Sequence, residues 1–227
     1  MKPFLLAVAF LPLAALGAPP RHVTLQYELS HNGTVMAEVK ETLEHDGASY
    51  KIVSEGRGKG VYALFARGSV TRTSEGAITA EGLRPREFRD RRGDNVAVAK
   101  FDWPGKALVQ ERKGKSESEP LPPNAQDRLC FLWTFAFAPL KGASVQAWVA
   151  DGRGAPSHFV YKVAGTEVLK TAAGDIEALH LVKQREGDDA RGTEIWLALK
   201  RDYVPVRILV IEKDGARLDQ VVTRIDG

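Results

Sequence analysis

The chain has 227 residues, of which 44% are hydrophobic and 27% are charged, a balance that excludes an intrinsically disordered chain. Its 32 Lys and Arg residues nearly balance its 29 Asp and Glu residues, so the formal net charge of +3 gives no support to a nucleic-acid partner. A single cysteine excludes an intrachain disulfide and a Cys-rich zinc site, while 21 glycines and 12 prolines suit a fold with many turns.

The first seventeen residues have the layout of a secretory signal peptide. Lys2 precedes an apolar run at residues 4–16, and small residues follow at Gly17 and Ala18. The run is shorter than the roughly 20 apolar residues that a membrane span needs, and no later stretch reaches that length. We therefore expect export to the periplasm, cleavage after Gly17 and a mature chain without a transmembrane segment. An uncleaved N-terminal anchor is the alternative.

Beyond the signal peptide, apolar and polar residues alternate with a period of two, and turn residues recur at short intervals. Asn32-Gly33 is a strong signal for a tight hairpin, because both residues tolerate positive φ. The pattern predicts a mainly β fold, a curved antiparallel sheet in a single domain at 18–227. In the first half we predict strands at residues 23–30, 34–44, 48–55, 61–65, 69–73, 77–81, 95–102 and 106–112.

A polar segment with three prolines, residues 113–123, divides the chain and is predicted to be a solvated connector. A helix is predicted at 125–138, with Asn124 as its cap and Asp127 returning a hydrogen bond to that cap. In the second half we predict strands at residues 144–150, 158–163, 167–171, 176–185, 193–199, 204–212 and 217–225.

The predicted helix is apolar on nearly every side, since large side chains include Leu129, Phe131, Trp133, Phe135 and Phe137. Such a helix must be buried all round. A flat sheet could shield only one half of it, so we expect the sheet to wrap around the helix as an open or partly closed barrel.

Several segments of the chain resemble the domain-of-unknown-function 3108 family, a group of proteins exported by Gram-negative bacteria. They are AQDRLCFLWTFAFAP at 125–139, GLRPREFRDRR at 82–92, FDW at 101–103, TAAGDIEALHL at 171–181, and EIWLA, YVPVRI and DG between residues 194 and 215. The resemblance covers most of the mature chain. It implies export and a β-rich fold and supplies no reaction.

The ending of the chain is also similar to that of periplasmic lipoprotein carriers and other open β-barrel envelope proteins. A Trp-bearing strand is followed by a short turn, by Pro-Val-Arg at 205–207 and by Asp-Gly at 214–215. This similarity implies a curved sheet that holds acyl chains or partner segments inside, and it is an analogy of fold alone. The chain departs from the carriers in having one apolar helix instead of several.

The residue types of common catalytic and metal sites do not come together in the sequence. The five histidines stand alone without an HxH or HxxxH pair, and neither Gly-x-Ser-x-Gly nor Ser-x-x-Lys occurs. Cys130 lies within the apolar helix, where a thiol is typically inert packing. We therefore expect no metal site, no cofactor and no nucleophilic hydrolysis.

Polar and aromatic side chains near the predicted helix and neighbouring turns remain as candidates for a binding site. Five arginines crowd residues 83–93, and their guanidinium groups suit a carboxylate or an anionic head group. The structural alternative has Asp127 as a helix cap, Arg128 paired with an acid on a neighbouring strand and the arginine run solvated on an edge strand. In this alternative residues 102–103 form a corner beside a Pro-Gly turn. The candidate binding residues are Arg86, Asp102, Trp103, Asp127, Arg128, Trp133 and Trp196.

The sequence favours a non-enzymatic periplasmic protein that binds an apolar or acylated ligand, or an envelope partner polypeptide, with arginines such as Arg86 near one end of the cavity. One alternative is a cell-envelope hydrolase with carboxylate-based catalysis. Another is a structural envelope factor without a pocket. An apolar pocket of about 300 Å³ or more would favour the binding protein. Converging carboxylates with perturbed pKa values would favour the hydrolase, and an interior filled with side chains would favour the structural factor.

Overall fold

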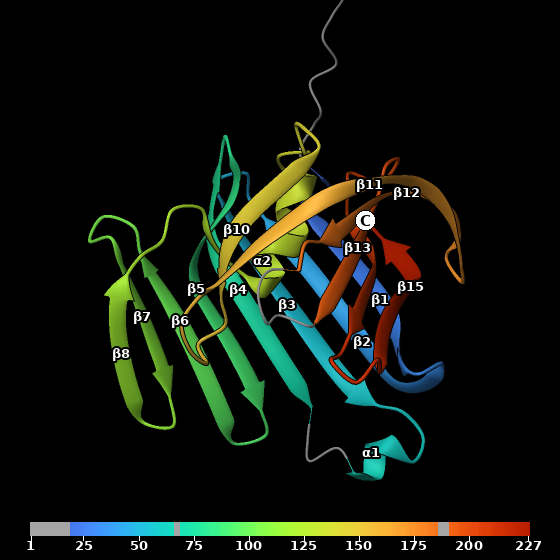
Figure 1. Cartoon of the computed structure of the whole chain (residues 1–227), viewed down its shortest axis with the longest axis horizontal. Coiled ribbons are helices and arrows are strands. Elements are labelled where there is room, and N and C mark those ends of the chain that lie inside the picture. Colours follow the sequence, from blue (N-terminus) through green and yellow to red (C-terminus); the bar gives the residue numbers. More distant parts are fainter. Residues whose placement is uncertain (1–18, 66–68, 186–190) are drawn as a thin grey trace, which may run out of the picture.

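The computed structural model of the chain describes residues 19–65, 69–185 and 191–227 (Figure 1). The predicted signal peptide lies outside the described residues. The described strands form one sheet of 15 strands. They are β1 (His22–His31), β2 (Thr34–His45), β3 (Ser49–Gly58), β4 (Val70–Thr79), β5 (Gly82–Arg92), β6 (Asn95–Asp102), β7 (Ala107–Arg112), β8 (Lys115–Pro120), β9 (Ala125–Asp127), β10 (Ser144–Ala150), β11 (Ser157–Thr171), β12 (Gly174–Lys183), β13 (Gly192–Ala198), β14 (Pro205–Ile211) and β15 (Arg217–Asp226).

The sheet consists of two meanders joined at its middle. The strand order is β8-β7-β6-β5-β4-β3-β2-β1-β15-β14-β13-β12-β11-β10-β9, and all neighbours are antiparallel except β9 and β10. The first and last strands, β1 and β15, pair with each other at the centre. Strands β8 and β9, which are consecutive in the sequence, form the two edges of this large, curved sheet. Because these two edges do not pair with each other, the sheet is not closed into a barrel.

Short turns explain why consecutive strands pair. The β1–β2 turn places Asn32 at φ 49° and Gly33 at φ 83°, the positive values that a tight hairpin needs. Asp46 fixes the next turn, where its Oδ1 accepts hydrogen bonds from the backbone N–H groups of Ala48 (2.8 Å) and Ser49 (2.7 Å). The predicted antiparallel organisation is confirmed.

One end of the sheet curls over the other, and the contact between them is here called the seam. The turn between β10 and β11 packs on β6, where a Cβ added to Gly152 would lie 2.7 Å from the backbone nitrogen of Val98. The same turn is bound to β7, because Nε2 of Gln110 donates to the carbonyl oxygen of Gly154 at 2.7 Å. Figure 1 shows β10 and β11 crossing in front of the first half of the sheet.

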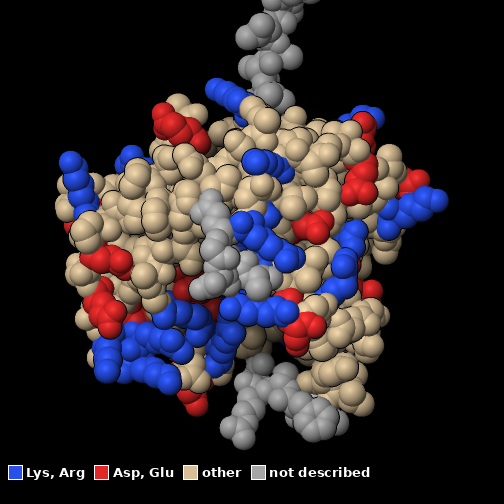
Figure 2. All heavy atoms as spheres, viewed as in Figure 1, with Lys and Arg blue, Asp and Glu red and all other residues tan. Residues whose placement is uncertain are grey.

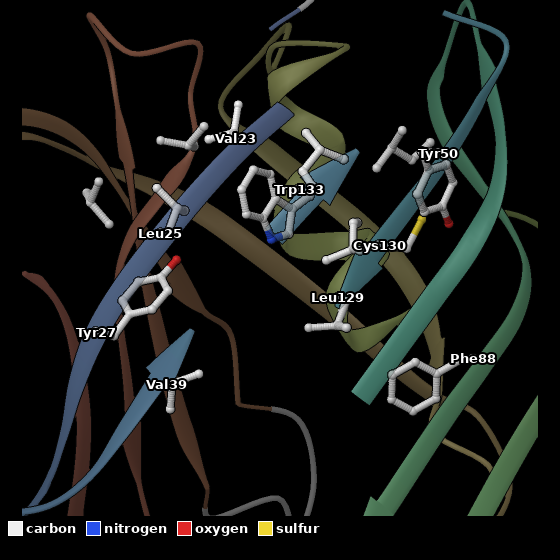
Figure 3. Packing of buried hydrophobic residues seen from close by; sticks show 14 of the residues in the cluster. Val23, Leu25, Tyr27, Val39, Tyr50, Phe88, Leu129, Cys130 and Trp133 are labelled. Carbon is white, nitrogen blue, oxygen red and sulfur yellow. The ribbon is translucent and has the colours of Figure 1, made fainter. Parts of the chain in front are cut away.

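Helix α2 (Arg128–Trp133) and the 3₁₀ turn at Thr134–Ala136 lie inside this curl. Leu129, Cys130 and Trp133 point toward the strands of the first meander, as Figure 3 shows, and belong to one hydrophobic cluster. Phe131 and Phe135 belong to a second cluster, with residues of β10 to β13. The sheet therefore covers the helix from both sides, as its apolar sequence predicts, and Trp133 is 0% exposed.

The helix is shorter than the predicted 125–138. Residues 125–127 extend as β9 and pair in parallel with β10, which leaves Asp127 rather than Asn124 as the N-cap. Asn124 instead adopts φ 54° ahead of the strand. The parallel pairing with β10 is a long-range contact, and it competes with helix formation at these residues.

Two predictions about the polar segments of the first half are wrong. The proposed connector at 113–123 contains strand β8, whose backbone pairs with β7 along its whole length although its side chains are almost all exposed. The arginine-rich strand β5 is not at an edge, since it lies between β4 and β6. Composition indicates solvation of side chains correctly and says little about backbone pairing.

Other differences concern where strands begin and end. The predicted strand at 61–65 is the one-turn helix α1 (Tyr62–Phe65), which follows Gly60 at φ 59°. The pairs 69–73 with 77–81 and 158–163 with 167–171 are the single strands β4 and β11. In β11 the alternation is interrupted between Val163 and Gly165, whereas the register shift of β4 at Glu75/Gly76 comes from an extra residue on its partner β5.

Candidate functional site

A cavity of about 440 Å³, here called the central cavity, lies between helix α2 and the two meanders. Its size is within the range of small-molecule sites, roughly 300–1,000 Å³. Most of its described lining is apolar or aromatic: Leu29, Leu129, Phe131, Leu132, Val149, Phe159, Tyr161, Ile195, Ile208, Val210 and Leu218. Charged side chains also border it, namely Arg72, Arg92, Arg128, Lys183 and Arg191 with Glu41 and Glu212.

A wider, more polar hollow of about 880 Å³ adjoins the central cavity. The two share Arg128, Phe159, Lys183, Arg191 and Glu212 in their linings. Figure 2 shows that Lys and Arg side chains gather around the middle and lower left of the face seen in Figure 1. The arrangement is an apolar interior behind an entrance rich in cations.

A row of polar side chains crosses the inner face of the first meander, where apolar residues would be expected. Glu41 on β2 lies opposite Ser54 on β3, Ser54 opposite Arg72 on β4, and Arg72 opposite Asp90 on β5. Glu41 and Arg72 line the central cavity. The row, here called the polar row, therefore places one negative group, Glu41, and one positive group, Arg72, on the side of the cavity.

At one end of the polar row, three guanidinium groups surround a single carboxylate. Oδ2 of Asp90 lies 3.0 Å from Nη2 of Arg92, 3.0 Å from Nη2 of Arg153 and 3.6 Å from Nε of Arg72. The Asp90 side chain is 2% exposed. Burial alone would raise the pKa of Asp90, but the three guanidinium groups outweigh it and hold the pKa below its ordinary value. We call these four residues the arginine cluster.

The seam assembles the arginine cluster. Arg72 and Arg92 come from β4 and β5 of the first meander, whereas Arg153 comes from the β10–β11 turn that packs over them. In the same turn Asp151 pairs with Arg128 of α2, with Oδ2 and Nη2 3.2 Å apart. The curl of the sheet thus brings together cations that lie far apart in the sequence.

At the other end of the polar row, Glu41 is buried and satisfied by neutral donors. Its Oε1 accepts from Oγ of Ser54 at 3.1 Å, and its Oε2 accepts from Nε1 of Trp133 at 3.0 Å. Burial raises the pKa of Glu41, and these hydrogen bonds oppose that rise only in part. The hydrogen bond to Glu41 holds the indole of Trp133 against strand β2.

Asp127 forms a second buried carboxyl group beneath the helix. Its Oδ1 accepts from the backbone N–H groups of Leu129 and Cys130, both at 2.9 Å, and its Oδ2 accepts from Oγ of Ser74 at 2.6 Å. Burial raises the pKa of Asp127 to about 7 despite these donors. Burial likewise raises the pKa of the Cys130 thiol, which disfavours a reactive thiolate. Asp127 is thus a helix cap, as the structural alternative predicts.

Arg86, Asp102 and Trp103 do not line the central cavity. Arg86 is exposed, and its Nη2 lies 3.0 Å from Oε1 of Glu75. Asp102 fixes a corner by accepting from the backbone N–H of Gly105 at 3.0 Å. Trp103 donates from Nε1 to the carbonyl oxygen of Pro85 at 2.7 Å. These three residues make local structural contacts on β5 and the β6–β7 turn.

Trp196 lies on the opposite face of β13 from the cavity, because its neighbour Ile195 lines the cavity and side chains alternate along a strand. Its indole stacks on the imidazole of His180, with ring centroids 4.3 Å apart, and the Arg207 guanidinium lies 4.5 Å from its centroid. Its Nε1 donates to Oε1 of Glu167. Of the candidates named from the sequence, Arg128 is the one found among the described lining residues of the cavity.

A β-bulge explains why Arg86 does not line the cavity. Alternation would place Arg86 on the same face as Phe88, Asp90 and Arg92. In the structure Glu75 pairs with Glu87 and Gly76 with Pro85, so Arg86 is left unpaired and turns outward. Arg92 lies four residues after the fully buried Phe88, so alternation along β5 places both side chains on the same face. Arg92 lines the cavity, and this alternation would have predicted its position. Arg72 and Arg153 carry no comparable signal in the sequence.

Within residues 19–65, 69–185 and 191–227 there is no group of three or more His, Cys, Asp or Glu side chains that could hold a metal ion. In the same residues no helix has the length and apolar character required to cross a membrane.

Comparison with solved structures supports the fold. The chain is similar to a β-barrel-like protein of the domain of unknown function DUF1849 from Brucella abortus, with a TM-score of 0.56 and 10% identity over 92% of this chain and 99% of that chain. At this identity the likeness concerns the fold alone.

Two further structures have lower TM-scores. A "putative lipoprotein" from Parabacteroides distasonis gives 0.43 at 7% identity, covering 93% of this chain and 98% of that chain. A "putative exported protein" from Bacteroides fragilis gives 0.37 at 6% identity, covering 92% of this chain and 98% of that chain.

No curated protein matches the sequence of the chain significantly. The profile of the family described as "Protein of unknown function (DUF3108)" matches residues 26–221, nearly the whole of the described sheet, and the chain belongs to this family.

Proposed function

We propose that the protein is an exported binding protein that takes the apolar chain of an amphiphile, such as an acyl chain, into the central cavity. The observation that carries the proposal is the cavity itself, about 440 Å³ between α2 and the sheet, with apolar walls and cations at its border. A structural factor would be expected to fill this space with side chains, because protein interiors are close-packed.

The energetics favour an extended apolar ligand. Each methylene removed from water contributes about 0.8 kcal/mol, so a chain of several methylenes offsets the entropy lost on association. The described apolar wall comes from β1, α2, β10, β11, β13, β14 and β15. Such a wall gives little directional specificity along the chain, and the charged border distinguishes the head of the ligand from its tail.

Carboxylate-based catalysis receives less support from the geometry. The two carboxyl groups with raised pKa values, Glu41 and Asp127, are each engaged with their own hydrogen-bond donors. Glu41 lines the cavity, whereas Asp127 is not among its described lining residues. The pair therefore does not converge on a common point in the cavity.

Export to the periplasm is part of the proposal, and it rests on the sequence pattern of residues 1–17. The measurement is an intact mass from a periplasmic fraction of cells expressing the full chain. A species beginning at Ala18 is expected, and a species that begins at Met1 would contradict cleavage.

The binding test is titration of the purified, delipidated protein with a fluorescent fatty acid. Saturable binding at micromolar concentration is expected. Val210, which is half-buried and lines the cavity, is replaced in Val210→Trp to fill the space, and binding should then weaken strongly. Val168→Trp is the matched control, because Val168 is 60% exposed and does not line the cavity.

Absence of saturable binding by the parent protein would contradict the proposal and favour a polypeptide partner. Equal loss of binding in both Trp variants would also count against it, since the effect would then not depend on the cavity. Val210→Trp must keep the thermal midpoint of the parent within a few degrees for the comparison to hold.

A further inference from the structure

We propose that the arginine cluster at the border of the central cavity is a subsite for a phosphate monoester, the head group of the amphiphile whose tail the cavity binds. The inference rests on the proposed function for the tail. It goes further by assigning residues and a chemical class to the head. The residues are Arg72, Arg92 and Arg153, with Asp90 as their resident counter-ion.

The first argument is that donors in the cluster are unused. Nε of Arg72 and Nε of Arg153 are buried and have no hydrogen-bond partner within the described residues, whereas Nη2 of Arg153 lies 3.0 Å from Oδ2 of Asp90. An unsatisfied buried donor costs free energy, more so when it is charged. A ligand with several acceptor oxygens would remove that cost.

The second argument is the balance of charge. Three guanidinium groups meet at one carboxylate oxygen, Oδ2 of Asp90, so two positive charges are left without a counter-ion inside the cluster. The neighbouring cation Arg128 is already paired with Asp151. Burial lowers the pKa of Arg72, and repulsion from Arg92 and Arg128 adds to this effect against the attraction of Asp90 and Glu41.

A phosphate monoester fits both observations better than a carboxylate does. It carries a charge of about −1.5 to −2 at neutral pH and offers three strong acceptor oxygens. Guanidinium groups bind phosphate oxygens in pairs through their planar donors. A carboxylate would neutralise about half of the excess charge and present two oxygens.

The position of the cluster suits the head of a ligand whose tail is inside. Arg72 and Arg92 line the central cavity, and their side chains are 30% and 48% exposed. Arg72 and Arg92 thus give the arginine cluster one side that is partly exposed and borders the apolar walls, while Asp90 lies buried behind them. A phosphate held there would direct its alkyl chain toward the interior.

The experiment compares ligands that share one tail. Decyl phosphate, decanoate and decanol are titrated calorimetrically into the delipidated protein, all below their critical micelle concentrations, together with inorganic phosphate. Decyl phosphate is expected to bind about tenfold or more tightly than decanol, with decanoate between them. Inorganic phosphate is expected to bind far more weakly than decyl phosphate.

Two variants separate the head from the tail. Arg153→Met should weaken decyl phosphate about tenfold and leave the affinity for decanol unchanged. Arg86→Met is the matched control, because Arg86 is exposed and lies outside the cavity lining. Arg92→Met tests the same subsite from a half-exposed position, should the loss of Arg153 weaken the seam.

Asp90→Asn gives a prediction of opposite sign that a purely structural cluster would not produce. Removing the resident carboxylate raises the excess positive charge, so decyl phosphate should bind more tightly and raise the thermal midpoint more than it does in the parent. Weaker or unchanged phosphate binding by folded Asp90→Asn would overturn the assignment of the anion site.

The remaining outcomes distinguish the inference from the proposed function. Equal affinity for decyl phosphate and decanol in the parent would overturn the head-group subsite and keep the apolar cavity. Inorganic phosphate binding as tightly as decyl phosphate would identify a free anion and overturn the head-group assignment. No binding of any ligand would overturn both proposals.

Discussion

The two ends of the polar row contain buried carboxylates in opposite circumstances. Glu41, like the nearby cap Asp127, accepts hydrogen bonds from neutral donors and has a pKa raised by burial. Asp90 is surrounded by guanidinium groups and has a lowered pKa, and the Nε atoms of Arg72 and Arg153 have no hydrogen-bond partner within the described residues. The first arrangement is complete within the chain, whereas the second has an excess of positive charge.

Buried charge is therefore satisfied within the chain at one end of the polar row and is not balanced within the arginine cluster at the other. A carboxyl group whose oxygens are satisfied by a Trp, a Ser and helix N–H groups holds α2 in place and needs nothing from outside. A cluster with surplus cations and unused donors is costly unless an anion completes it. Four predictions test this distinction, from the largest expected effect on stability to the smallest.

The largest effect on stability is expected at the end of the polar row where the hydrogen bonds of Glu41 are complete. Trp133→Ala should lower the free energy of unfolding by roughly 3–5 kcal/mol, because it leaves a cavity in the core and removes the donor to Glu41. Urea denaturation monitored by circular dichroism measures the change. Trp133→Phe keeps much of the volume and should cost less. A midpoint equal to that of the parent would mean that α2 contributes nothing to the core.

The second-largest effect on stability is expected at the seam, which assembles the arginine cluster. Gly152→Ala should destabilise the protein by roughly 1–3 kcal/mol, since the residue adopts φ 72° and a Cβ would lie 2.7 Å from the backbone of Val98. Gly154→Ala in the same turn is the control, because nothing lies within 4 Å of its added Cβ. Equal effects of the two substitutions would refute a close approach specific to Gly152.

The pH dependence of Asp127 sharpens the contrast with Asp90. The folded pKa of about 7 lies above the ordinary value of 3.8 for an aspartate, so the unfolded chain loses its proton first as pH rises, and the parent loses stability between about pH 4 and pH 7. The substitution Asp127→Asn removes this pH-dependent contribution to the free energy of unfolding. Its stability relative to the parent should rise across that window and level off above it.

Unfolding free energies of parent and Asp127→Asn at a series of pH values test this expectation. A difference that stays constant from pH 4 to 8 would show that the carboxyl is not held protonated in the fold. Asp90, whose pKa is lowered, should contribute in the opposite direction, with stability gained as pH rises through the acid range.

The smallest effect is expected for an arginine outside both ends of the row. Arg86→Met should change the free energy of unfolding by no more than about 0.5 kcal/mol, because its side chain is 72% exposed and its ion pair with Glu75 is solvated. Chemical denaturation at low and moderate salt checks this. A substantial loss of stability would place Arg86 among the structural arginines after all.

Much of the fold follows from local sequence. The alternation of apolar and polar residues and turns such as Asn32-Gly33 predict an antiparallel meander, and they act over a few residues. The apolar helix around Trp133 requires cover on all sides, which predicts a curved sheet. Among the candidate site residues, Arg128 is found beside the cavity because it is the first residue of that helix.

The arginine cluster depended on tertiary structure. A single unpaired residue, Arg86, reverses the faces of β5, and a period of two carries no record of such a shift. Arg153 reaches Asp90 because one end of the sheet curls over the other, a contact between residues far apart in the chain. Sequence alone therefore determined the antiparallel β pattern and the need to bury the helix, whereas long-range packing at the bulge and the seam decided which arginines meet at the cavity.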